Sequence, residues 1–133
     1  MHKRGSDDLQ WQELKKIVAE RDVNCKLIAI LTAKEFLILQ KNGGKCINRC
    51  DTAHVFGVGP FPKLCYDSDN VYLINHYSHS MLDNVCSPID GSPMTKEEKR
   101  IWWVKIIGRE KYLSLLNKLR SKEDGRVEGN QDK

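Results

Sequence analysis

Residues 51–83 of the chain read DTAHVFGVGPFPKLCYDSDNVYLINHYSHSMLD. His54 stands at the end of a stretch in which apolar residues alternate, and we predict a first strand near residues 46–55. The loop GVGPFPKLC (residues 57–65) carries two glycines and two prolines, which exclude a regular element there. A second apolar run, near residues 71–74, predicts a second strand.

A helix is expected directly after the second strand, near residues 77–84. His79 and Asp83 lie four residues apart in this segment, so a helix places both side chains on one face. The segment therefore predicts an imidazole and a carboxylate side by side, next to two short strands.

The order of His54, Asn70 and His79, with nine residues from Asn70 to His79, resembles the HNH endonuclease family. The fold of that family is two short antiparallel strands and a helix that grip one divalent metal ion. The resemblance implies an α+β protein with a ββα-metal core and flanking N- and C-terminal helices. It also implies a metal-dependent endonuclease that hydrolyses DNA phosphodiester bonds in phage DNA recombination, repair or processing.

The chemistry explains why such residue types are needed. Phosphodiester hydrolysis requires a deprotonated water, an electrophile on the phosphate and stabilisation of the leaving oxygen. The resemblance makes His54 the candidate general base and His79 a candidate metal ligand. In the family, the asparagine that corresponds to Asn70 holds the base imidazole in its orientation. Asp83, one helical turn after His79, could complete the metal site.

The first strand departs from the commonest family pattern. Many family members carry a metal-binding Asp or His directly before the base, where this chain has Ala53. Residues two apart in a strand share a face, so Asp51 replaces it as the expected ligand. We do not take His76 as a ligand, and a phosphate contact is left open for it. The expected cofactor is one divalent ion, Mg²⁺ or Mn²⁺ in the cell, although the donor set also suits Zn²⁺ or Ni²⁺.

The chain has five cysteines. Many HNH proteins hold a structural zinc with one Cys pair before the first strand and a second pair on the helix. Cys46 and Cys50 lie at the first of these places, but Asn75 and Ser78 occupy the second. We therefore expect reduced thiols and no structural zinc, in keeping with the odd number of cysteines. The alternative is a small zinc-stabilised interaction protein that uses Cys46, Cys50, Cys65 and Cys86.

Positive charge is concentrated toward the C-terminus. The net charge is +4 over 133 residues, yet residues 96–120 hold eight Lys or Arg against three Glu. Such a cluster is typical of a surface that contacts phosphates. We expect five of its members to bind DNA, duplex or branched: Lys99, Arg100, Lys105, Arg109 and Lys111.

Length and composition fit one domain over residues 1–120. Charged residues make up 30% of the chain, and residues 121–133 are polar and poor in apolar side chains, so we predict a disordered tail there. The sequence has no apolar run that could span a bilayer and no signal peptide at its start. We expect a cytoplasmic protein with no membrane partner, in a bacterial or phage-infected cell as the resemblance implies, and the sequence carries no signal for an oligomeric state.

Helical spacing and capping patterns predict the flanking helices. Ser6 is a candidate cap for a first helix that ends near residue 21. Thr32 with Glu35, and Thr95 with Glu98, each have the spacing of a capping box. Further helix ends are expected at the glycine pair 43–44 and at Gly108. Trp102 and Trp103 cannot both face the core, because neighbours on a helix diverge by about 100°.

The resemblance leaves two alternative functions open. The segment WWVKIIGREKYLSLL (residues 102–116) is similar to the end of the Rap (NinG) recombination nucleases, which act on branched DNA such as Holliday junctions. The other reading is a non-catalytic nucleic-acid-binding module that kept the same fold.

Overall fold

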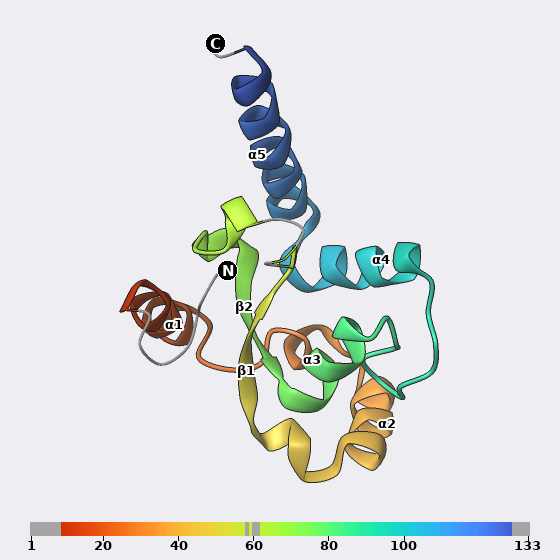
Figure 1. Ribbon diagram of the computed structural model, residues 1–133. Coiled ribbons are helices and arrows are strands. Elements are labelled where there is room, and N and C mark those ends of the chain that lie inside the picture. The colour runs from red at the N-terminus through yellow and green to blue at the C-terminus, as the bar shows by residue number, and fades with distance from the viewer. Residues whose placement is uncertain (1–8, 58, 60–61, 129–133) are drawn as a thin grey trace.

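A two-stranded antiparallel sheet lies at the centre of the molecule, with helices on both sides (Figure 1). The computed structural model describes residues 9–57, 59 and 62–128. The strands are β1 (Cys50–His54) and β2 (Val71–Asn75). The α-helices are α1 (Leu9–Asp22), α2 (Ala33–Gly43), α3 (His76–Asp83), α4 (Lys96–Ile107) and α5 (Arg109–Glu128). The predicted α+β class and the antiparallel strand pair followed by a helix are confirmed.

The ladder pairs His54 with Val71 at one end and Cys50 with Asn75 at the other. It cannot extend further, because the chain turns into α3 directly after Asn75, whose side chain caps that helix by accepting from the Ser78 amide. The predicted strand start at residue 46 is therefore wrong. Residues Gly44–Asn48 instead form a short 3₁₀ helix.

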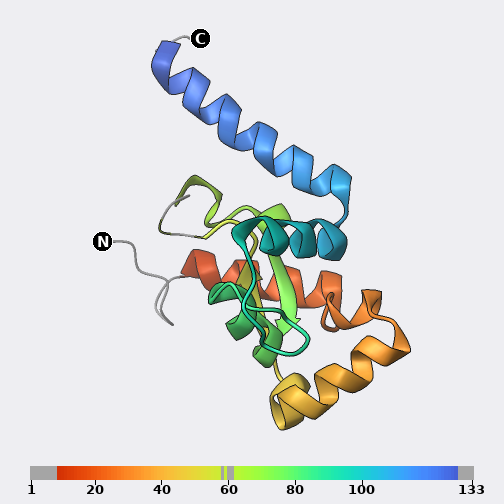
Figure 2. The ribbon, with the colours of Figure 1, turned by 90° about the vertical axis from the view of Figure 1, so that its right-hand side faces the viewer.

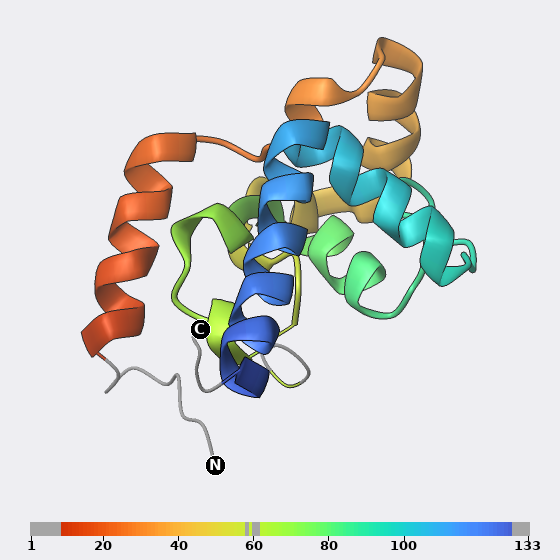
Figure 3. The same cartoon turned by 90° about the horizontal axis from the view of Figure 1, so that it is seen from above.

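The two faces of the sheet pack against different helices. Trp11, Leu14 and Val18 of α1 pack with Val71 on one face. On the other face, a larger core joins residues of both strands to α3, α4 and α5, namely Ala53, Tyr72, Ile74, Leu82, Trp103, Ile106, Tyr112 and Leu115. Viewed from above, α1 and α3 lie on opposite sides of the strand pair (Figure 3). The sheet is thus a thin layer between α1 and the larger core.

Both predicted capping boxes are confirmed. The Thr32 and Thr95 hydroxyls accept from the backbone amides of Glu35 and Glu98, and each glutamate reaches back to the amide of its cap residue. The helix ends are confirmed as well, since α2 ends at Gly43 and α4 ends before Gly108, whose φ of 94° favours glycine. Ser6 lies outside the described residues.

The cap of α4 provides a stability test. We expect Thr95→Ala to lower the free energy of unfolding by about 1 kcal/mol, because the first turn loses an acceptor for an amide. Urea denaturation followed by circular dichroism measures the change. Thr95→Ser keeps the hydroxyl and should behave like the wild type, and an equal loss in both variants would contradict the capping argument.

The prediction that Trp102 and Trp103 do not both face the core is also confirmed. Trp103 is buried, whereas Trp102 lies half-buried under the Lys105 ammonium. Beyond Gly108, α5 projects away from the rest of the protein (Figure 2). Its backbone stays helical past residue 121, where the sequence predicts a disordered tail, as far as Glu128. Within the described residues, no helix has both the length and the apolar character needed to cross a membrane.

Candidate metal and catalytic site

His79 is the centre of the candidate site and links the other two predicted ligands. Its Nδ1 lies 2.9 Å from Asp51 Oδ2, across the gap between α3 and β1. Its Nε2 lies 3.2 Å from Asp83 Oδ2, one turn further along α3. The structure therefore brings Asp51, His79 and Asp83 together in one connected set. The ladder register and the start of α3 after Asn75 produce this arrangement.

His76 belongs to the same cluster, although sequence reasoning set it aside as a ligand. Its Nδ1 lies 2.7 Å from Asp51 Oδ2, the oxygen that also faces His79. The two histidines are three residues apart at the start of α3, so both project toward the strand. Arg49 Nε lies 3.9 Å from the other oxygen of Asp51. Asp51 is thus surrounded by nitrogen donors.

These contacts raise the pKa of His79 and lower the pKa values of Asp51 and Asp83. The hydrogen bond with Asp83, and then that with Asp51, raises the pKa of His79 above its usual 6.5. Burial acts to raise the pKa of Asp51, but its bonds with His79 and His76 outweigh this and lower it below 3.8. The pKa of Asp83 is also lowered against the effect of burial, through His79 and the nearby charges of Lys99 and His54.

The shifts predict how stability depends on pH in metal-free protein. The raised pKa of His79 adds stability that is complete below about pH 6.5 and is lost as the pH rises through the folded-state value. The lowered pKa values of Asp51 and Asp83 add stability that is complete above about pH 4 and is lost at lower pH. We expect the contribution of the cluster to be largest between these limits. Urea midpoints across the pH range measure it, and His79→Gln should remove the loss on the alkaline side.

His54, the predicted base, lies at the last position of β1. Its Nε2 is 2.9 Å from the carbonyl oxygen of Cys65. A carbonyl only accepts, so Nε2 carries the ring proton and Nδ1 is the basic nitrogen of the neutral imidazole. The ring stacks on Trp11 of α1, with 5.3 Å between ring centroids and 14° between planes. One contact engages a ring nitrogen and the other a ring face, and neither has a signature in the sequence.

Asn70 is fully buried and holds the loop that follows His54. Its side chain accepts from the Phe56 amide at 2.8 Å and donates to the carbonyls of Phe56 and Leu64 at 3.0 and 3.1 Å. Its own carbonyl accepts from the Val55 amide. The resemblance predicts that Asn70 orients the base. The bonds described here fix the backbone on both sides of the loop, next to His54 and next to Cys65.

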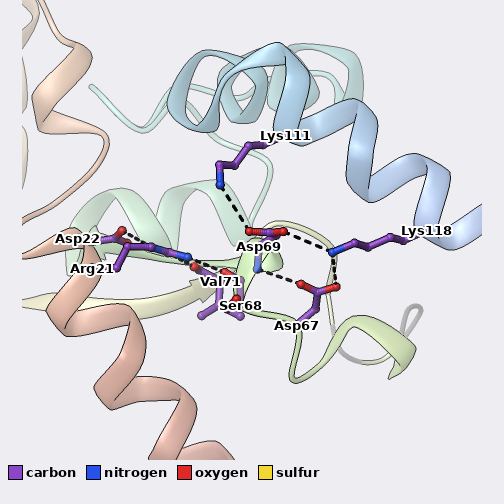
Figure 4. Close-up of polar contacts among 8 residues, drawn as sticks. All are labelled: Arg21, Asp22, Asp67, Ser68, Asp69, Val71, Lys111 and Lys118. Atoms are coloured by element: carbon purple, nitrogen blue, oxygen red, sulfur yellow. Dashed lines mark hydrogen bonds and ion pairs between the residues drawn. The ribbon is translucent and has the colours of Figure 1, made fainter.

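The same loop is tied to α5 by ion pairs (Figure 4). Lys118 Nζ lies 2.9 Å from Asp67 and 3.3 Å from Asp69, and Lys111 Nζ lies 3.5 Å from Asp69. Lys111, a predicted DNA-binding residue, is thus in contact with a carboxylate that precedes β2. The pairs are partly exposed, so each adds little stability.

The other predicted DNA-binding residues lie on α4 and at the start of α5. The charge of Lys99 acts on Asp83, which makes it the member of the set with an electrostatic link to the candidate site. Arg100 forms an ion pair with Glu97. Arg100 and Arg109 line a hollow of about 260 Å³ between the two helices, and Lys105 lies over the Trp102 ring at 4.7 Å. The five residues thus differ in their immediate contacts.

The donor set is chemically suited to a divalent ion, because carboxylate oxygens and imidazole nitrogens bind Mg²⁺, Mn²⁺ and Zn²⁺ in proteins. Within the described part of the chain, no three His, Cys, Asp or Glu side chains are arranged around a common metal position. The donors instead face one another in pairs, as hydrogen-bonded histidines and carboxylates do.

The five cysteines differ in their exposure to solvent. Cys25 and Cys65 are buried, Cys46 and Cys50 are exposed, and Cys86 is intermediate. The Cys25 sulfur accepts from the backbone and side-chain nitrogens of Asn75, at 3.1 and 3.4 Å. Asn75 thus contacts a sulfur from another part of the chain and caps α3.

No protein-family model matches the chain, and neither a curated protein nor a solved structure matches it significantly.

Proposed function

We propose that this protein is a metal-dependent endonuclease of HNH type that hydrolyses DNA phosphodiester bonds. One observation carries the proposal: His79 contacts both Asp51 and Asp83 at the junction of an antiparallel strand pair and a helix. His54 lies at the end of the first strand, and its charge acts on Asp83. The candidate base at the end of β1 is thus linked electrostatically to the candidate cation site through Asp83.

In this proposal, His54 acts as the general base. Nδ1 of His54 removes a proton from the attacking water, while the Cys65 carbonyl keeps the other ring nitrogen protonated. Asn70 keeps that carbonyl in place through the loop backbone. A divalent ion held by His79 and one of its two carboxylate partners would supply positive charge to the scissile phosphate and the leaving oxygen.

Substrate binding in this scheme draws on the basic residues of α4 and α5. Lys99 is the candidate for a phosphate next to the scissile bond, because its charge acts on Asp83. Arg100 and Arg109, at the hollow between the helices, would contact phosphates further away. Such contacts position DNA without reading its sequence, so we expect binding to weaken steeply with added salt.

Cleavage assays test the proposal directly. Purified protein is incubated with supercoiled plasmid and, separately, with a synthetic four-way junction, in Mg²⁺, in Mn²⁺ and in EDTA. We expect cutting that needs the metal and is lost in His79→Ala. Preference for the junction would identify branched DNA as the substrate.

Binding without cutting, with every one of Mg²⁺, Mn²⁺, Zn²⁺ and Ni²⁺, would contradict the proposal and favour a non-catalytic nucleic-acid-binding module. Metal analysis tests the zinc alternative in the same preparation. Stoichiometric zinc that survives His79→Ala but is lost in Cys46→Ser would favour the interaction protein.

A further inference from the structure

The two carboxylates that face His79 lie on opposite sides of its ring. Asp51 contacts Nδ1, and Asp83 contacts Nε2. The two nitrogens of an imidazole point in divergent directions, so one cation can bind only one of them. Asp51 and Asp83 therefore cannot both share a cation with His79 in this arrangement. The side on which the cation binds decides which carboxylate is a ligand.

The Asp51 side is already filled by donors of the protein. One oxygen of Asp51 bonds to His76 at 2.7 Å and to His79 at 2.9 Å. The other oxygen lies 3.9 Å from the Arg49 guanidinium, which would repel a cation. Only 23% of the Asp51 side chain is exposed, which leaves little room for the waters and phosphate oxygens that complete the shell of Mg²⁺ or Mn²⁺.

The Asp83 side is open. The Asp83 side chain is 62% exposed, and in the described part of the chain its hydrogen-bonding partner is His79. The charge of Lys99 and, when it is protonated, that of His54 also lower the pKa of this carboxylate. In the proposed function, Lys99 is the candidate for a contact with the DNA phosphate, and His54 is the candidate general base. The Nε2 side thus offers space, a carboxylate and the reacting groups together.

We propose that Asp51 is not a metal ligand but a positioning residue, which holds Nδ1–H of His79 so that Nε2 and Asp83 face the cation. The inference rests on the proposed function. A carboxylate that accepts from the far nitrogen of a metal-binding histidine fixes the tautomer and the direction of the ring. His76 and Arg49 hold Asp51 in turn, which gives His76 a role that needs no contact with the cation.

Nitrogen NMR of the histidine side chains tests the assignment. Uniformly ¹⁵N-labelled protein is titrated to saturation with Zn²⁺, a diamagnetic probe, and the ring nitrogens of His79 and His76 are followed. We expect the metal-induced shift at His79 Nε2, a proton retained on His79 Nδ1, and an unchanged His76 ring. A shift at His79 Nδ1 together with His76, or no shift at His79, would overturn the inference.

Two matched variants complete the test. Asp51→Asn should keep Zn²⁺ on Nε2 while lowering affinity about 10- to 100-fold, as is typical when the partner of a metal-binding histidine is removed. Asp83→Asn should abolish the Nε2 shift. The opposite ranking of the two variants would overturn the inference, and backbone amide spectra establish that both are folded. Zn²⁺ on Nε2 in a protein that cuts no DNA would refute the nuclease and leave the role of Asp51 supported.

Discussion

His54→Ala is expected to reduce DNA cleavage about 100- to 10,000-fold while leaving DNA affinity unchanged, since this is the usual contribution of a general base. The expectation follows from the position of the ring. The Cys65 carbonyl accepts from Nε2–H, so Nδ1 is the basic nitrogen of the neutral form, and the stack on Trp11 fixes the ring plane. Alanine removes that nitrogen and touches none of the basic residues of α4.

Single-turnover cleavage of a labelled duplex or junction measures the rate, and fluorescence anisotropy in Ca²⁺ measures the affinity. His76→Ala is the matched control, because it also removes a partly exposed imidazole from the same neighbourhood. We expect its rate to fall much less. An equal fall in both variants, or loss of DNA binding in His54→Ala, would mean that His54 supports the structure and does not act as a base.

Asn70→Ala is expected to have the largest effect on stability, lowering the free energy of unfolding by roughly 3–5 kcal/mol. The side chain satisfies the Phe56 amide and the carbonyls of Phe56 and Leu64 inside the protein. Alanine removes all three bonds, and a buried polar group that loses its hydrogen-bond partner costs about 1–3 kcal/mol. Because the loop also carries the Cys65 carbonyl, the folded fraction should cleave DNA slowly.

Urea denaturation with a two-state fit measures the change. Asn42→Ala is the matched control, since Asn42 makes one exposed hydrogen bond to the Ile38 carbonyl. Its effect should stay within about 0.5 kcal/mol, as is usual for surface positions. A loss below about 1 kcal/mol in Asn70→Ala would contradict the view that this side chain holds the loop.

The elements of the fold follow from local signals, which is why they can be predicted. Capping boxes need a hydroxyl and a glutamate three residues apart, and the chain has that spacing at Thr32 and Thr95. The glycines after α2 and α4 end those helices because their backbone angles disfavour other residues. The strand start was predicted too early, because the end of a ladder depends on the partner strand, which here ends at Asn75.

The candidate site could be predicted only in part. Asp51, His79 and Asp83 do meet, since strand parity and helical spacing bring them together. The partner of the base is the backbone carbonyl of Cys65, and any residue type can supply a carbonyl. Likewise, the contact of Lys111 with Asp69 joins positions 42 residues apart, which no local pattern predicts.

The stack of Trp11 on His54 has a consequence for experiments. Indole fluorescence is quenched by a protonated imidazole in contact with it, so Trp11 is an intrinsic optical reporter of proton uptake by its neighbour. In a variant with Trp102 and Trp103 replaced by phenylalanine, emission would follow the charge on His54 without substrate, label or metal. The helix that covers one face of the sheet thereby makes the candidate base directly observable.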